Sequence, residues 1–205
     1  MQVIQALFIG LALILSTEVM ADHSGRKVIE TNGPIVKRIL IMSLDEAPGK
    51  RWPPVAREIS KALETRPSSL DYWTKLGEEL ASQDREAMTL RLEKELGALP
   101  YTEDTADEWI GPIELASRGF KGDCEDYAAL ALYVLGVAGV PEFEAVGVLG
   151  YDHLERPHAV VFIKDGDTWR VADFASPGGL ESIDAGFKPI GGGTTGHVAI
   201  NLTKE

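Results

Sequence analysis

The stretch from Asp123 to Gly136 constrains the fold of this chain more than any other. Asp123 is a favourable N-cap residue, and Asp126 stands at the third helical position, where a capping box places its acidic or amide partner. The helix that follows is apolar on nearly every side, with Tyr127, Ala128, Leu130, Leu132 and Val134. A helix of this kind is buried in a globular domain. The rest of the chain is therefore expected to pack around it.

The hydrophobic pattern differs on the two sides of this helix. Before it, apolar residues recur at helical spacing in three segments, 55–64, 69–80 and 84–96. After it the pattern has a period of two, which predicts strands at 144–149, 158–164, 167–174 and 197–202. The glycine clusters 178–179 and 191–193 predict loops. Helices followed by antiparallel strands predict an α+β domain.

The first residues of the chain predict export. Ala6–Leu15 is an apolar core of signal-peptide length, and Val19–Ala21 offers a cleavage site with small residues at the required positions. The core is short and poorly flanked for a membrane span, and an uncleaved anchor is the alternative. We therefore expect residues 1–21 to be a signal peptide and residues 22–205 to form a single domain, with its core at about 99–205.

Charge and cysteine content narrow the functional class. The chain has 32 acidic and 20 basic residues, a net charge of −12, which speaks against nucleic acid and anionic membranes as partners. The excess suits either a cation such as calcium or a solvated surface. Cys124 is the only cysteine, so no disulfide can form within the chain. A lone thiol at the head of a helix, with histidine and aspartate downstream, is a candidate nucleophile.

A hairpin signal brings a histidine and an aspartate together. Asp165-Gly166 is a typical two-residue turn, and a hairpin that turns on it places His158 directly opposite Asp173. Opposed residues have Cβ atoms about 4.5–5.5 Å apart, so Asp173 can accept a hydrogen bond from the His158 ring. The same face carries apolar residues and is expected to face the core: Val160, Phe162, Trp169 and Val171.

Cys124, His158 and Asp173 together would form a nucleophilic triad. A carboxylate fixes the tautomer of the histidine and stabilises its imidazolium form, and the histidine takes the thiol proton. Packing the head of the Cys124 helix against the hairpin would bring the three side chains together. The positive end of the helix dipole favours a thiolate, whereas the charges of Glu125 and Asp126 oppose one.

Simpler interpretations of these residues remain open. A buried cysteine at a helix start can be no more than a small hydrophobic residue. His158 can be a strand-end histidine that is satisfied by a backbone carbonyl. His153 is a rival base, although its surroundings predict a loop and offer no comparable cross-strand carboxylate.

The region around Cys124 resembles a known family. Asp107–Leu115 (Asp-Glu-Trp-Ile-Gly-Pro-Ile-Glu-Leu) precedes Gly122–Ala128 (Gly-Asp-Cys-Glu-Asp-Tyr-Ala), and this order is similar to that of the bacterial transglutaminase-like cysteine peptidases. The similarity is greatest to their periplasmic, calcium-dependent LapG branch, which releases large adhesins from the cell surface. It continues through Gly139–Pro141, His158–Val161 and Val171–Asp173, and covers about 99–174.

The resemblance implies a papain-like, transglutaminase-like fold in which N-terminal helices precede a nucleophile helix packed on an antiparallel sheet. It implies Cys124 as nucleophile, His158 as base and acid, and Asp173 as the residue that orients the histidine. It also implies that Asp123 and Glu125, the acidic residues flanking the cysteine, bind calcium, an ion that favours carboxylate oxygens. The alternative is that Asp123 only caps the helix and Glu125 is solvated.

The resemblance further implies a periplasmic location, a role in biofilm release, a large surface adhesin as protein substrate, and an inner-membrane receptor that sequesters the protease. Two other functions fit the same residues. One is a transglutaminase-like acyltransferase, which passes the acyl group to an amine in place of water. The other is a non-catalytic binding module with a buried cysteine.

Overall fold

A computed structural model gives the structure of the chain. It describes residues 19–21, 27–30, 38–43, 51–103, 108–152, 154–174 and 187–198. The proposed signal core Ala6–Leu15, the rival base His153 and the glycines 178–179 lie outside these residues. Within the described ranges, no helix has the length and apolar character needed to cross a membrane.

Helices make up most of the described residues between Trp52 and Glu144. They are α1 (Trp52–Thr65), the short 3-10 turn η1 (Ser68–Leu70), α2 (Asp71–Leu80), α3 (Arg85–Leu96), α4 (Pro112–Ser117), α5 (Cys124–Val137) and the 3-10 turn η2 (Glu142–Glu144). The capping box predicted at the head of α5 is present, and Asp126 Oδ2 lies 3.3 Å from the backbone nitrogen of Asp123. The start of the central helix is therefore set by its own sequence.

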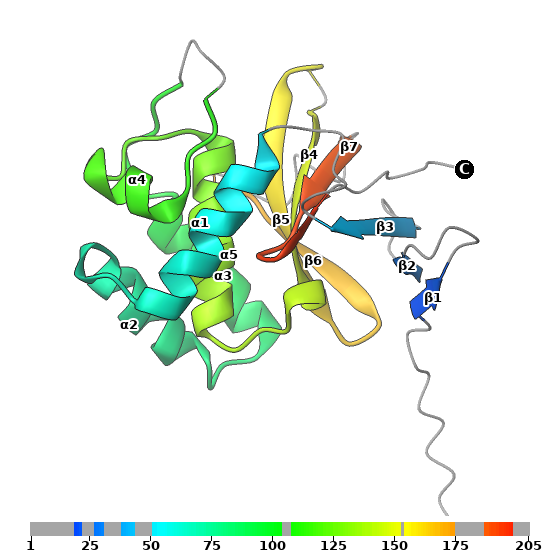
Figure 1. The fold of residues 1–205 in the computed structure, drawn as a ribbon, viewed down its shortest axis with the longest axis horizontal. Coiled ribbons are helices and arrows are strands. Elements are labelled where there is room, and N and C mark those ends of the chain that lie inside the picture. The colour runs from blue at the N-terminus through cyan, green and yellow to red at the C-terminus, as the bar shows by residue number, and fades with distance from the viewer. Residues whose placement is uncertain are drawn as a thin grey trace, which may run out of the picture.

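The strands form one antiparallel sheet. They are β1 (Val19–Ala21), β2 (Lys27–Glu30), β3 (Arg38–Ser43), β4 (Ala145–Tyr151), β5 (Pro157–Asp165), β6 (Thr168–Ala172), β7 (Lys188–Gly193) and β8 (His197–Val198). Their order across the sheet is β1-β2-β3-β8-β7-β4-β5-β6. The predicted α+β class is confirmed, with the helices on one side of the molecule and the sheet on the other (Figure 1).

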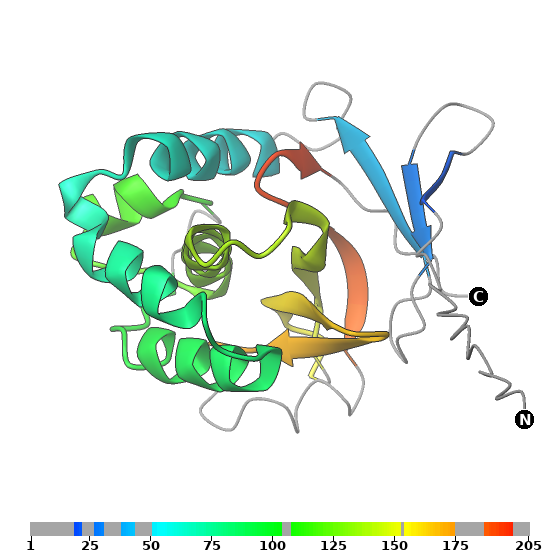
Figure 2. The same cartoon turned by 90° about the horizontal axis from the view of Figure 1, so that it is seen from below.

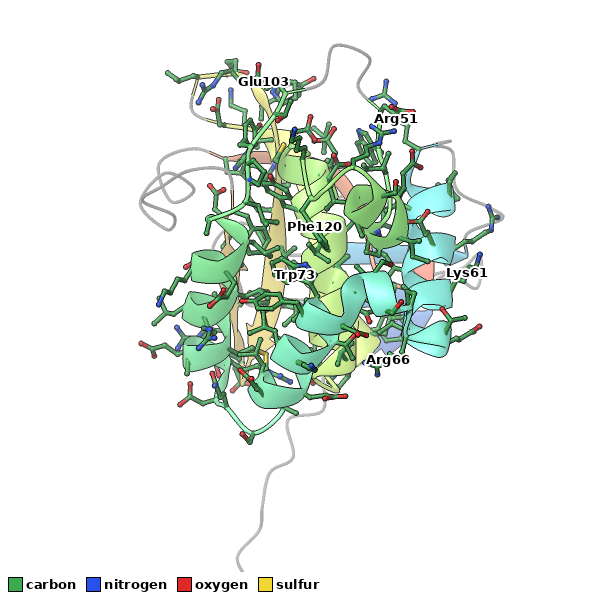
Figure 3. The ribbon with its side chains drawn as sticks, turned by 90° about the vertical axis from the view of Figure 1, so that its left-hand side faces the viewer. Arg51, Lys61, Arg66, Trp73, Glu103 and Phe120 are labelled. Atoms are coloured by element: carbon green, nitrogen blue, oxygen red, sulfur yellow. The ribbon has the colours of Figure 1, made fainter. Side chains whose placement is uncertain are left out.

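Helix α5 lies at the centre, as its apolar surface predicts. Seen almost along its axis, it is surrounded by α1, α2 and α3 and faces the sheet on its remaining side (Figure 2). Every residue from Asp126 to Leu135 is buried. Trp73 of α2 and Phe120 pack together in the same core, with ring centroids 5.7 Å apart (Figure 3). This burial makes α5 the rigid support on which Cys124 stands.

The loop predicted at Gly191–Gly193 is wrong, because these glycines belong to strand β7. A Cβ at Gly192 would lie 2.0 Å from the carbonyl oxygen of Gly147, and one at Gly193 would lie 1.8 Å from Trp52 Nε1. Glycine at these positions lets strand β4 and the Trp52 side chain approach β7 closely, and it does not mark a turn. The Trp52 indole donates to the Thr194 carbonyl at 3.3 Å, which joins α1 to the end of β7.

The predicted hairpin register is also wrong, by two residues. The turn consists of Gly166 and Asp167, so Phe162 pairs with Val171 in place of Trp169. Gly166 has φ +59, and a turn with glycine first competes with the predicted Asp-Gly turn. A shift of two residues leaves every side chain on its own face. Continued past its last pair, the register places Asp173 beside Val160, which makes His158 its diagonal neighbour.

Both faces of β5 are buried, and α5 packs on the face that the sequence did not single out. Ala159, Val161 and Ile163 join the α5 core. The face with Val160 and Phe162 belongs to a second, smaller cluster on the other side of the sheet, with Val146, Val148 and Phe187. The predicted apolar face exists, but it packs in this second cluster, whereas α5 packs on the opposite face of the sheet.

Candidate active site

The candidate nucleophile lies at the first position of α5. Cys124 is 7% exposed, and its Sγ lies 3.1 Å from Glu125 Oε2, at which the thiol points as a donor. The thiol also lies against the backbone of Ala159, the residue after His158. Burial, followed by the negative charge of Glu125 and the hydrogen bond to it, raises the pKa of Cys124. In this arrangement the thiol is held protonated.

The acidic residues on either side of Cys124 crowd the thiol. Asp123 is buried and Glu125 is half-buried. Burial is the main cause that raises the pKa of Glu125, and the charge of Asp123 adds to it. Both effects mean that two carboxylates are held close together in a poorly solvated place, an arrangement that a bound cation would stabilise.

The candidate base and its carboxylate form a close pair on the sheet. His158 Nε2 lies 3.0 Å from Asp173 Oδ2, and the two side chains are 12% and 1% exposed. The separation is that of an ion pair, although the ring N–H is not directed at the oxygen closely enough for a hydrogen bond. Because Nε2 faces Asp173, the other ring nitrogen, Nδ1, is the one available to a thiol.

Two further contacts orient this pair. The Phe187 ring meets the His158 ring edge-on, with centroids 6.5 Å apart. Gly150 leaves room for this ring, because a Cβ there would lie 2.6 Å from Phe187 Cζ. On the other side, Glu93 of α3 lies with Oε1 3.2 Å from the backbone nitrogen of Asp173 and accepts its N–H.

Asp126 has a structural role that explains why it follows the cysteine so closely. Its Oδ1 accepts the backbone N–H of Ile110 at 3.0 Å, while Oδ2 faces the backbone nitrogen of Asp123. Asp126 thereby ties the segment before α4 to the head of α5. Both carboxylate oxygens of Asp126 thus face backbone groups.

The segment 101–103 completes the surroundings of the thiol. Tyr101 forms an isolated bridge with Gly122, and the Thr102 N–H donates to the Gly122 carbonyl at 2.8 Å. Burial is the main cause that raises the pKa of the Tyr101 phenol, and the nearby Cys124 and Asp123 add to it. Glu103 is labelled at this end of the molecule in Figure 3. Tyr101 is 44% exposed, so its side chain reaches solvent near the thiol.

The predicted site residues are therefore only partly brought together. His158 and Asp173 form a pair, and Cys124 reaches the strand beside them, but among the described residues no hydrogen bond joins the thiol to His158. Asp123 and Glu125 flank the thiol as predicted. The described residues contain no group of three or more His, Cys, Asp or Glu side chains placed to hold a metal.

Solved structures with the same fold are known. The match to Legionella pneumophila LapG with bound calcium has a TM-score of 0.56 and 19% identity, and covers 73% of this chain and 90% of that one. The match to EGTA-treated LapG from the same organism has a TM-score of 0.56 and 20% identity, and covers 73% of this chain and 86% of that one. The match to a candidate cysteine protease from Cytophaga hutchinsonii has a TM-score of 0.50 and 14% identity, and covers 77% of this chain and 54% of that one.

The chain shares the LapG fold. No protein-family model and no curated protein matches the sequence, so the likeness is one of structure. The predicted transglutaminase-like arrangement, with helices before a nucleophile helix that packs on an antiparallel sheet, is confirmed at this level.

Three residues at the site were not found from the sequence. Glu93, Tyr101 and Phe187 all reach the site from elements distant in the chain, and none belongs to a recognisable motif. Tyr101 follows Pro100, which predicts only the end of the preceding helix. Glu93 is one of several charged residues on an ordinary helix. Only the tertiary fold distinguishes them from surface residues.

Proposed function

We propose that this protein is a cysteine endopeptidase in which Cys124, His158 and Asp173 act as nucleophile, base and orienting acid. The observation that carries the proposal is the His158–Asp173 pair, 3.0 Å apart, together with the contact between the Cys124 thiol and the backbone of Ala159, which follows His158 on β5. The fold shared with LapG supports it.

The chemistry follows from the positions of these groups. Nδ1 of His158 takes the proton of the Cys124 thiol, and the thiolate attacks a backbone carbonyl of the substrate. The backbone N–H of Cys124, at the positive end of α5, donates to the oxyanion. His158 then gives the proton to the leaving amine. A thioester remains, and water hydrolyses it with His158 as base.

Asp173 holds the imidazolium in place during these steps. Its carboxylate is 1% exposed, so its charge acts on the ring with little screening by water. For the first step the thiol must turn from Glu125 towards His158. Glu125 and His158 therefore compete for the single S–H donor of Cys124.

Calcium is proposed as an activator held in part by Asp123 and Glu125. The donor set fits a calcium ion, because both ligands are carboxylates and their mutual repulsion is relieved by a cation. Two side chains are too few to complete the shell, so backbone carbonyls and water must supply the rest. The ion would neutralise the negative charge beside Cys124 and so favour a thiolate.

The proposed setting is the periplasm, reached by a signal peptide at residues 1–21. The proposed substrate is a large surface protein of the adhesin type, and the proposed regulator is an inner-membrane receptor that sequesters the protease. These proposals rest on the resemblance around Cys124 and on the shared fold. Release of a surface protein would give the enzyme its role in biofilm dispersal.

Iodoacetamide labelling of Cys124 at pH 7 tests the proposed nucleophile. Wild type and His158→Ala are compared, each with calcium and with EGTA, and Cys124→Ser serves as the blank. We expect rapid labelling only in wild type with calcium. Equal labelling of wild type and His158→Ala would contradict the proposal and leave a structural cysteine.

The reaction type needs a second assay. The protein is incubated with an unfolded protein substrate and a fluorescent primary amine, and the products are analysed by mass spectrometry. New amino termini without amine incorporation are expected for a peptidase. Incorporation of the amine without cleavage would show an acyltransferase that uses the same triad.

A further inference from the structure

Helix α3 holds the strand that ends at the candidate triad acid. Its packing against β6 is visible in Figure 2. Near its start, Glu86 Oε2 lies 3.1 Å from a guanidinium nitrogen of Arg170, and near its end Glu93 accepts the N–H of Asp173. Helix α3 lies outside the segment that resembles the peptidase family, so its role can be read only from the structure.

The backbone of Asp173 needs a partner that the sheet does not supply. Strand β6 is the last strand of the sheet and ends at Ala172, so Asp173 is one residue past its final pair with β5. Asp173 is 3% exposed, and a buried N–H without an acceptor is costly. Glu93 Oε1 supplies the acceptor at 3.2 Å.

The Glu93 carboxylate occupies an unfavourable place for a charge. Burial raises the pKa of Glu93, and the charge of Asp173 adds to this, while the hydrogen bond from the Asp173 N–H lowers it. A carboxylate held half-buried beside another carboxylate needs a compensating contact. The one that the structure offers is the backbone of the residue that faces His158.

The chain after α3 also passes near the residue after Asp173. A Cβ at Gly97, which follows α3, would lie 3.8 Å from the carbonyl oxygen of Phe174. The end of β6 therefore runs beside the end of α3, and Glu93 supplies the hydrogen bond between them.

We propose that Glu93 is a positioning residue, which acts through the backbone of Asp173 to hold the Asp173 carboxylate against His158. Its catalytic consequence rests on the proposed peptidase function, whereas its effect on the His158–Asp173 pair does not. Loss of the Glu93 carboxylate lets the end of β6 move. A shift of the carboxylate then weakens the pair and slows activation of Cys124.

The test uses the full chain with ¹⁵N-labelled histidine. The ring resonances of His158 are assigned by their loss in His158→Ala, and Asp173→Asn gives the direction in which they move when the pair is broken. We expect Glu93→Ala to move them in that direction. Glu93→Gln, whose amide oxygen can accept the same N–H, should restore most of the wild-type position.

Glu86→Ala is the matched control. Glu86 lies on the same helix and contacts the same strand, but its side chain is 63% exposed and meets Arg170, not Asp173. The His158 ring resonances of Glu86→Ala should match those of wild type. In parallel, alkylation of Cys124 at pH 7 with calcium should slow by about tenfold in Glu93→Ala, because small displacements of catalytic groups are costly.

The outcomes separate the inference from the proposed function. Wild-type resonances in Glu93→Ala, with shifted ones in Asp173→Asn, would overturn the positioning role. Shifted resonances without any dependence of Cys124 alkylation on His158 would uphold the positioning role and overturn the peptidase. If Glu93→Ala does not fold, Glu93→Asp, which keeps the charge but shortens the side chain, must show the same shift or the inference fails.

Discussion

The two halves of the candidate site differ in how complete they are. On the sheet, His158 and Asp173 are already paired, with Phe187 against the ring and Glu93 on the backbone. On the helix, the Cys124 thiol points at Glu125 and carries a raised pKa. In the sheet half the proposed base and acid already lie close together, whereas in the helix half the proposed nucleophile contacts a neighbouring carboxylate.

The difference shows where control can act on such a site. The sheet half depends on packing and on backbone hydrogen bonds, which change little with solution conditions. The helix half depends on the charges beside the thiol, which protons or a divalent cation can change. We therefore expect substitutions in the two halves to have effects of opposite sign on thiol reactivity.

The largest change in cleavage rate is expected from substitution of Asp173, the proposed acid of the sheet half. Asp173→Asn keeps the shape of the side chain but removes the charge that stabilises the imidazolium. We expect cleavage of an unfolded protein substrate to slow by about a hundredfold or more. Asp165→Asn, near the other end of the hairpin, is the control and should cleave at the wild-type rate. Equal rates for both variants would show that the pair takes no part in catalysis.

A smaller effect, of opposite sign, is expected on the reactivity of the Cys124 thiol when Glu125 in the helix half is substituted. The raised pKa of Cys124 keeps the thiol protonated at neutral pH, and Glu125→Gln removes a charge and an acceptor that raise it. A pKa lowered by one unit gives about ten times more thiolate below the pKa, so alkylation in EGTA at pH 7–8 should rise by about tenfold.

Calcium and a control variant sharpen this prediction. Calcium should accelerate alkylation of wild type more than that of Glu125→Gln, because the variant lacks the charge to be neutralised. Glu114→Gln, on exposed helix α4, should behave as wild type in both conditions. Slower alkylation of Glu125→Gln in EGTA would mean that Glu125 helps to ionise the thiol.

The smallest change in cleavage rate is expected from removal of the aromatic contact between Phe187 and the His158 ring. Phe187→Leu keeps an apolar side chain but removes the edge-on aromatic contact, which is worth about 1 kcal/mol, so cleavage should slow by about fivefold. Phe162→Leu, in the same cluster, tests the loss of packing alone. If both variants slow cleavage equally, the His158 contact has no separate role.

Local sequence signals were sufficient to predict helix α5, which carries the helix half of the site. The N-cap, the capping box and the apolar surface of α5 all lie within one short segment, so they predicted the helix and its burial. The His158–Asp173 pair was predicted through a wrong register. It survives because a two-residue shift keeps both residues on one face, and diagonal neighbours remain within reach of a long side chain.

The rest of the site depends on contacts between distant segments. Glu93 and Phe187 lie 80 and 14 residues from Asp173 in sequence, and no local pattern indicates that they meet it or its partner. Strand β7 was missed because glycine serves both turns and close chain contacts. The face of β5 that packs on α5 could not be chosen because both faces are apolar.

The bond between Trp52 and the end of β7 has a consequence for the order in which the chain folds. It joins residues 142 positions apart, and Ser60 adds a second such bond to the Thr195 carbonyl at 2.6 Å. Contacts of such long range form slowly, because a loop of 142 residues must close before they can form. Helix α1 therefore cannot form these two bonds until the segment after β7 has been synthesised.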